Sequence, residues 1–140
     1  KILTNPSEYS QAYRNYETAL EINPELAECH YWFAKLLSKG EKLKSDGSIT
    51  QEPEILKARH HLEKAIQIDN NFSKAYYKLG ILQVTNKEYS MALKNFEEAI
   101  KFNKNFAEAH YQIALLLMDE NAQKEIATPQ KKSQKNKVSR

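Results

Sequence analysis

The sequence has little of what several classes of protein require. It contains one Cys, so it forms no internal disulfide, and no Cys/His spacing suggests structural zinc. Three Gly and four Pro are too few for a loop-rich or low-complexity chain. The longest apolar run, residues 113–118, is much shorter than a membrane span. These absences predict a helical domain that does not cross a membrane.

The charged residues are unevenly distributed. Although 21 basic and 18 acidic residues give a net charge of +3, five of the bases follow residue 127 without any acid. Residues 1–127 therefore carry 16 bases against 18 acids, which argues against a nucleic-acid-binding body. Residues 128–140 contain one large apolar residue, Val138, and are predicted to be a disordered basic tail.

Two patterns recur with the same spacing. One is Ala, a large apolar residue four positions later and Ala three positions after that. It occurs at Ala12, Tyr16 and Ala19, at Ala58, Leu62 and Ala65, and at Ala92, Phe96 and Ala99. The other places a large residue three positions before an apolar–small pair, at His30, Phe33 and Ala34, at Tyr76, Leu79 and Gly80, and at His110, Ile113 and Ala114. Both repeat after 46 and then 34 residues, which predicts repeated helical hairpins.

The 34-residue period and these motifs resemble the tetratricopeptide repeat, and residues 73–106 are the best copy. The resemblance implies an all-α solenoid, a right-handed superhelix of antiparallel helix pairs, over residues 1–127. Its expected parts are the second helix of a unit (6–23), a unit with a 12-residue insertion near 40–52 (27–72), a unit (73–106) and the first helix of a further unit (107–126).

The insertion contains a turn signal, Ser45 to Ser48, between segments that favour helix at 39–44 and 53–57. We expect the two flanking helices to extend into it. A neutral surface insertion and a separate contact surface both remain open. The last helix is expected to continue from 107 toward Ile126 and to stop before Pro129.

The sequence offers no catalytic constellation. His60 and His61 are adjacent and diverge around a helix, and His30 and His110 lie two units apart, so none of them shares a metal ion. Cys29 lacks a His or Asp at motif spacing and is interpreted as an interhelical filler. With neither a phosphate-binding Gly loop nor a nucleophile–base pair, we expect no enzyme, no cofactor and no metal.

The resemblance places the candidate site on the concave face, which the first helix of each unit lines. Tyr31, Tyr77 and Tyr111 occupy one equivalent place in three successive units. The other expected groove residues are Trp32, Lys35, Lys74, Lys78, Ile81, Gln112 and Leu115. Tyr side chains suit peptide contacts, and the Lys residues favour acidic or carboxylate-bearing peptides. The alternative is that these Tyr residues only pack between helices.

The resemblance does not extend to the clamp of chaperone-binding tetratricopeptide domains, which consists of Lys, Asn and Arg. The matching places hold Tyr31, Lys35, Lys78, Glu108 and Gln112. Recognition of a chaperone's acidic C-terminus by that clamp is therefore not expected.

The sequence thus predicts a non-catalytic scaffold that binds a protein or peptide. The alternative is self-association or assembly within a larger repeat protein, through an apolar end helix that includes Leu116 and Met118. An RNA-binding adaptor ranks lowest, because it depends on the tail alone. The single Cys favours a reducing compartment such as the cytoplasm, although the sequence does not fix the localisation.

Overall fold

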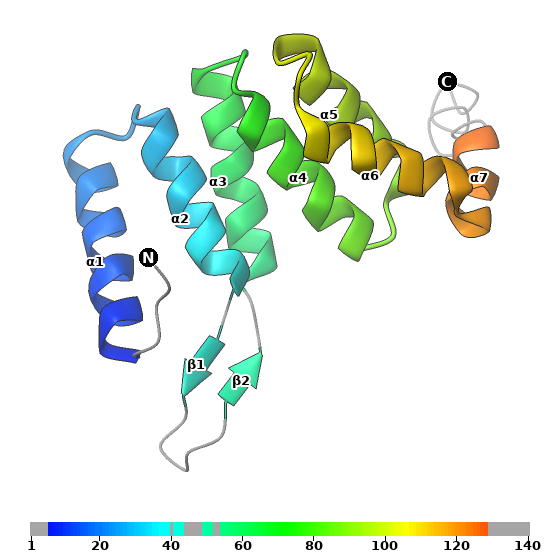
Figure 1. Cartoon of the computed structure of the whole chain (residues 1–140). Helices are drawn as coiled ribbons and strands as arrows, with labels where there is room; N and C mark the ends of the chain where they lie inside the picture. The colour runs from blue at the N-terminus through cyan, green and yellow to red at the C-terminus, as the bar shows by residue number, and fades with distance from the viewer. Residues whose placement is uncertain (1–5, 40, 44–48, 52–53, 129–140) are drawn as a thin grey trace, which may run out of the picture.

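The computed structural model describes residues 6–39, 41–43, 49–51 and 54–128. Its elements are α1 (Pro6–Ile22), α2 (Ala27–Lys39), β1 (Glu41–Leu43), β2 (Ile49–Gln51), α3 (Ile55–Ile68), α4 (Ser73–Thr85), α5 (Tyr89–Phe102), α6 (Ala107–Met118) and α7 (Glu120–Ala127). The helices stack in sequence order as a solenoid, with α2, α4 and α6 along one face (Figure 1). The predicted basic tail falls almost entirely outside the described residues.

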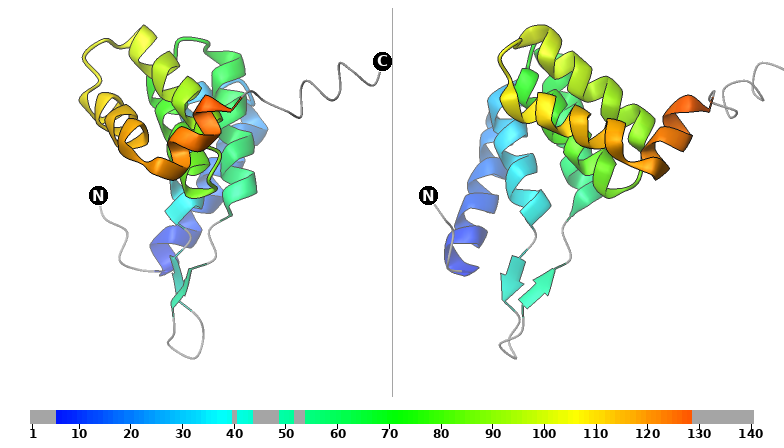
Figure 2. Two further views of the ribbon diagram at one scale, coloured as in Figure 1. Left: turned by 90° about the vertical axis from the view of Figure 1, so that its right-hand side faces the viewer. Right: turned by 45° about the vertical axis from the view of Figure 1, so that its right-hand side comes forward.

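Small residues allow the helices to approach closely. Ala58 and Ala65 in α3, and Ala92 and Ala99 in α5, are fully buried. The large residue between each pair, Leu62 or Phe96, is also fully buried. The strongest packing therefore joins α2 to α3 and α4 to α5, as expected for two helical hairpins (Figure 2).

The turns between units follow the same period as the helices. Asn23, Asp69 and Asn103 follow the 46- and 34-residue offsets, and each side chain accepts a hydrogen bond from the backbone N–H two residues later. Such Asx turns end one unit and begin the next. In each of α2, α4 and α6, one side chain hydrogen-bonds to a backbone carbonyl of the preceding turn. The pairs are His30 with Pro24, Tyr76 with Asn70 and His110 with Lys104, at 2.9–3.0 Å.

The insertion differs from its predicted form. Helix α2 ends at Lys39 and α3 begins only at Ile55, and the described residues between them form an antiparallel β-ribbon. Its register pairs Glu41 with Gln51 and Leu43 with Ile49. The expectation of longer helices was wrong because β-branched Ile49 and Thr50 favour a strand, whereas Pro53 disfavours helix at the residue before it. The turn signal at residues 44–48 lies outside the described residues.

The last helix also differs from its predicted form. A single helix over 107–126 was expected, but α6 ends at Met118, and α7 begins at Glu120. Asp119 adopts an extended backbone, and its carboxylate accepts a hydrogen bond from the Ala122 N–H at 2.9 Å. Asp119 is therefore the N-cap of a new helix, because a capping side chain satisfies a backbone donor that has no partner within the helix.

Gly80 on α4 lies directly against Phe96 of α5. A Cβ at this position would meet the Phe96 ring at 2.6 Å from Cε1 and 2.9 Å from Cδ1. Phe96 is fully buried, so its ring has no free space to enter. The close contact with Phe96 therefore favours a residue without a side chain at position 80.

We expect Gly80→Ala to destabilise the fold by about 1–3 kcal/mol, because overpacking exceeds the gain in helix propensity. Urea denaturation measures this effect. The cost should shrink in a Phe96→Leu background, where the smaller side chain makes room. Equal or higher stability of Gly80→Ala alone would contradict the packing argument.

His30 and His61 form a hydrogen-bonded pair between α2 and α3, with their Nδ1 atoms 2.9 Å apart. Because His30 Nε2 donates to the Pro24 carbonyl, His30 Nδ1 accepts from His61 Nδ1–H when both rings are neutral. Burial lowers the pKa of His61 to about 4, and the nearby charges of His30, His60 and Lys57 act in the same direction.

The His61 shift predicts acid sensitivity. The unfolded His61 binds a proton near its ordinary pKa of 6.5, whereas the folded one does so near 4. Its contribution to stability is therefore complete above pH 6.5 and falls as the pH drops toward 4, by about 3 kcal/mol in total. Urea denaturation across this range should show a smaller loss for His61→Gln than for the wild type. His110→Gln, which changes an exposed His, is the control and should behave as the wild type.

Candidate functional site

The three equivalent Tyr residues differ in exposure. Tyr31 on α2 is 7% exposed and packs on Phe72, with ring centroids 5.2 Å apart. Tyr77 on α4 is half-buried and packs on Phe106 at 4.9 Å. Tyr111 on α6 is 62% exposed. Two of the rings thus pack against the first turn of the next unit, and Tyr111 presents most of its surface to solvent.

Trp32 is a second exposed aromatic residue on this face. It is 42% exposed, and its Nε1 donates a hydrogen bond to the Glu28 carboxylate at 3.1 Å. The Lys35 ammonium lies 4.8 Å from the Trp32 ring centroid, within the range of a cation–π contact. Trp32 is therefore held in one orientation by its own helix while much of its surface stays open.

The hydroxyls of Tyr31 and Tyr77 interact with residues on α2, α4 and α6. Burial raises the pKa of Tyr31, and Glu28 and then Tyr77 act in the same direction. Burial also raises the pKa of Tyr77; Glu108 adds to this rise and a hydrogen bond with Gln112 opposes it. The hydroxyls remain neutral near pH 7 and can donate or accept hydrogen bonds.

The predicted Lys residues are not equivalent. Lys78 on α4 is half-buried, and burial lowers its pKa, followed by the charges of Lys35 and Lys39. Lys74, one turn earlier on α4, is exposed. Sequence reasoning missed Lys39, although its spacing of four residues from Lys35 places both on one face of α2.

The two apolar groove residues divide between core and surface. Ile81 packs against the cluster that contains Phe96 and Leu116, so it belongs largely to the core. Leu115 is 46% exposed and follows Tyr111 by four residues on the same face of α6. The structure therefore brings Trp32, Tyr111 and Leu115 to the surface of the helices that line the predicted groove.

The predicted assembly surface at the last helix is partly covered. Leu116 is only 4% exposed, because α7 folds back and packs Ala122 and Ile126 against it. Leu116 therefore cannot contact a partner while α7 is in place, and its assignment to an assembly surface was wrong. Met118, at 84% exposed, remains accessible.

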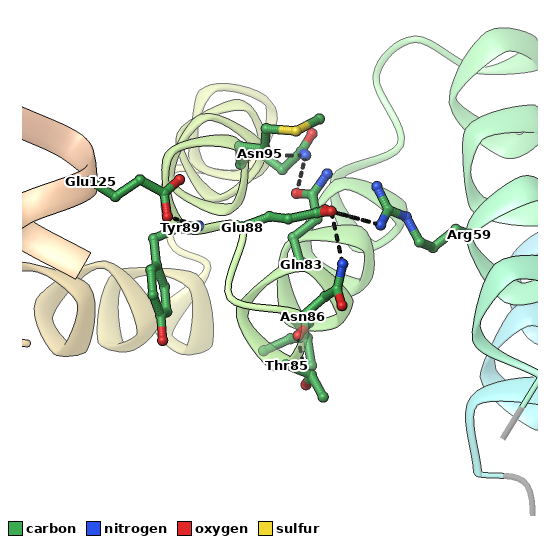
Figure 3. A network of polar contacts seen from close by, with 10 residues as sticks. Arg59, Gln83, Thr85, Asn86, Glu88, Tyr89, Asn95 and Glu125 are labelled. Atoms are coloured by element: carbon green, nitrogen blue, oxygen red, sulfur yellow. Dashed lines mark hydrogen bonds and ion pairs between the residues drawn. The ribbon is translucent and has the colours of Figure 1, made fainter. Parts of the chain in front are cut away.

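Helix α7 is anchored to the start of α5 through Glu125. The two carboxylate oxygens of Glu125 accept hydrogen bonds from the backbone N–H groups of Tyr89 and Ser90 at 3.2 and 2.9 Å (Figure 3). These are the first residues of α5, where backbone donors lack partners within the helix and the helix dipole favours a negative charge. One side chain thus caps α5 and holds α7 over Leu116.

A polar network joins α3 to the turn between α4 and α5, directly before the residues that Glu125 caps (Figure 3). Arg59 Nη1 lies 2.9 and 3.1 Å from the two carboxylate oxygens of Glu88, and Asn86 donates to Glu88 at 2.9 Å. Burial tends to raise the pKa of Glu88, but the hydrogen bonds from Arg59 and Asn86 outweigh it and leave the pKa below its ordinary value. This contact fixes α3 against the α4–α5 turn.

The described residues offer little for catalysis or metal binding. They contain no group of three or more His, Cys, Asp and Glu side chains that could hold a metal ion. The Cys29 Sγ contacts the Tyr16 carbonyl at 3.8 Å, and burial raises the pKa of this thiol, which disfavours the reactive thiolate. Within the same residues, every helix is too short or too polar to cross a bilayer.

Comparisons with known proteins agree with this architecture. A family model described as regulator of microtubule dynamics protein 1-3 matches residues 6–88, and a tetratricopeptide repeat model matches residues 73–106. The search of curated proteins gave no match.

Two solved structures illustrate the likeness in fold. MamA superposes with a TM-score of 0.64 at 21% identity; the match covers 86% of this chain and 60% of MamA. The first tetratricopeptide domain of Spaghetti, bound to the HSP90 peptide SRMEEVD, has a TM-score of 0.65 at 15% identity, over 87% of this chain and 82% of that domain. Both likenesses concern the fold, and they show that the chain forms a tetratricopeptide-type helical solenoid.

Proposed function

Since the chain belongs to the regulator of microtubule dynamics protein 1-3 family and contains a tetratricopeptide array, we propose that it holds a peptide or helix of a partner protein on the face formed by α2, α4 and α6. The description of the family connects its members with microtubule dynamics, and the proposed partner acts in that process. The scaffold itself performs no catalysis in this proposal.

One observation carries the proposal: α2 and α6 expose three large side chains on the face that they share with α4. Trp32 is 42%, Leu115 46% and Tyr111 62% exposed. Trp and Tyr are residues that contribute most to peptide contacts, and their exposure on one face supports an interaction site there. Hydrogen bonds and packing on the groove helices already hold Trp32 and Tyr77 in place, so little conformational entropy is lost when a partner binds.

The peptide mode has support from Spaghetti, whose tetratricopeptide domain of similar fold binds the peptide SRMEEVD. The chain lacks the Lys, Asn and Arg clamp of chaperone-binding domains, so the proposal concerns the groove and not that ligand.

Peptides selected from a random display library on the wild-type chain provide the test. We expect Trp32→Ala and Tyr111→Ala each to weaken the selected peptides about tenfold, because each removes an exposed aromatic contact. Met91→Ala is the matched control, since Met91 is 47% exposed but lies on α5, outside the groove helices. Fluorescence anisotropy measures the affinities. Equal binding by all three variants would contradict the groove.

Assembly through the end of α6 is the second candidate function, because Leu117 and Met118 are 54% and 84% exposed. The groove proposal expects a monomer in light scattering across about a hundredfold range of concentration. A dimer that Met118→Glu disperses would favour assembly instead. This variant leaves the core intact, unlike a substitution of buried Leu116.

A further inference from the structure

One side of α6 is exposed where the equivalent side of α2 is buried. Both helices carry the same three residue types, His, Ala and Leu, at offsets of four and three residues. The α2 triplet is His30, Ala34 and Leu37, and the α6 triplet is His110, Ala114 and Leu117. Every residue of the α2 triplet is buried, whereas every residue of the α6 triplet is exposed. The array thus presents the same surface twice, once covered and once bare.

Helix α3 packs on the side of α2 that carries its triplet. The His30 and His61 rings bond through their Nδ1 atoms at 2.9 Å, and the Glu54 N–H before α3 donates to the Leu37 carbonyl at 3.2 Å. The small–large–small pattern of α3 lies in the same core cluster as this triplet and is fully buried; it consists of Ala58, Leu62 and Ala65. A helix with this pattern is therefore what covers a His–Ala–Leu surface.

The intermediate unit shows the same arrangement with other residues. The places equivalent to the triplets on α4 hold Tyr76, Gly80 and Gln83. Helix α5 covers them: Phe96 lies directly against Gly80, and Asn95 donates a hydrogen bond to the Gln83 side chain at 2.7 Å. In both units a helix with the small–large–small pattern lies on this side, and α6 is the exception.

The His110 ring is oriented as the His30 ring is. His110 Nε2 lies 3.0 Å from the Lys104 carbonyl, just as His30 Nε2 lies 2.9 Å from the Pro24 carbonyl. A neutral ring that donates from Nε2 has Nδ1 as its acceptor. His30 Nδ1 accepts from His61, but no donor among the residues that the structure describes reaches His110 Nδ1.

The chain itself does not continue the pattern that would cover this side. Helix α7 packs against Leu116 and leaves Leu117 exposed. A further copy of the pattern of α5 would fall 34 residues later, where the sequence has Ile126, Gln130 and Ser133. A large polar residue thus stands at the place of the central apolar one.

A second copy of the chain has no such helix to spare either. Its α3 and α5 keep their patterns in the core. Helix α1 carries the pattern too, but its large residue, Tyr16, already stacks on Phe33 of α2 with ring centroids 5.5 Å apart. The occupant is therefore sought in another protein.

We infer that the side of α6 with the His–Ala–Leu triplet binds a helix of a partner protein that resembles α3. This helix has a small residue, a Leu four positions later, a second small residue after three more and a hydrogen-bond donor directly before the Leu. The small residues let its backbone approach Ala114, the Leu packs on Leu117, and the donor meets His110 Nδ1. The triplet lies about 100° around α6 from Tyr111 and Leu115, so the inference goes beyond the proposed groove.

The probe is a fluorescein-labelled peptide with the sequence of residues 54–69, which contain α3. Because an isolated helix of this length is marginal in water, a covalent staple joins positions 63 and 67, which α3 exposes. We expect the wild-type chain to bind it with a Kd below about 0.1 mM in fluorescence anisotropy. Leu117→Glu should weaken binding about tenfold, because its carboxylate would lie against the Leu of the probe.

Leu115→Glu is the matched control, since it makes the same change at a similarly exposed Leu on the groove side of α6. Its affinity for the probe should stay within about twofold of the wild type. Thermal denaturation checks that both variants are folded.

A second pair of changes tests the hydrogen bond. His110→Gln keeps an amide near the position of Nε2 and removes the Nδ1 acceptor, so we expect it to weaken the probe about fivefold. A probe with His61→Ala should bind the wild type and His110→Gln equally, because neither complex then has the bond. A loss of the same size with both probes would contradict the assigned contact.

Three results would overturn the inference as a whole: no binding of the probe at about 0.1 mM, equal binding by Leu117→Glu and the wild type, or an equal loss in Leu115→Glu. A fourth is a dimer that forms without the probe and that Leu117→Glu disperses, because a second copy would then occupy this side of α6. The groove is tested separately, since Leu117→Glu should bind the peptides selected for the groove as the wild type does.

Discussion

The structure depends on the close approach of helix backbones at small residues. Fully buried Ala58, Ala65, Ala92 and Ala99 let the second helix of each hairpin lie against its neighbours. At Gly80 the approach leaves no room even for a methyl group beside Phe96. Because interiors are packed to nearly crystalline density, these contacts fix the spacing of the helices and hence which side chains reach the groove surface. The exposed Trp32 and the half-buried Lys78 follow from that spacing.

The repeat architecture could be predicted because it is encoded twice in residues of distinctive size. Ala and large apolar residues recur at the same offsets on both helices of each unit, and no other period fits both sets. The Asx turns at Asn23, Asp69 and Asn103 follow the same offsets, so the sequence also contained this third signal. It was missed because a single Asn or Asp in a turn is too common to be informative alone.

The structure differs from the sequence-based predictions in two segments about which the repeat pattern gives no information. The insertion has no counterpart in the other units, so its strands could be inferred only from weak local preferences at Ile49 and Thr50. The break at Asp119 depends on a tertiary contact: Glu125 caps α5, and this contact requires α7 to turn back. A local reading of residues 107–126 shows only continuous helix propensity, which cannot compete with such a contact once the chain is folded.

The positions of the candidate site residues could be predicted, but their exposure could not. Equivalent places in the repeat hold Tyr31, Tyr77 and Tyr111, yet their environments differ because only the first two rings pack on the turn that follows their own unit. Phe72 and Phe106 cover the first two, and within the described residues no further unit covers Tyr111. Position in a finite array therefore decides which copies of a repeated side chain are buried and which stay exposed.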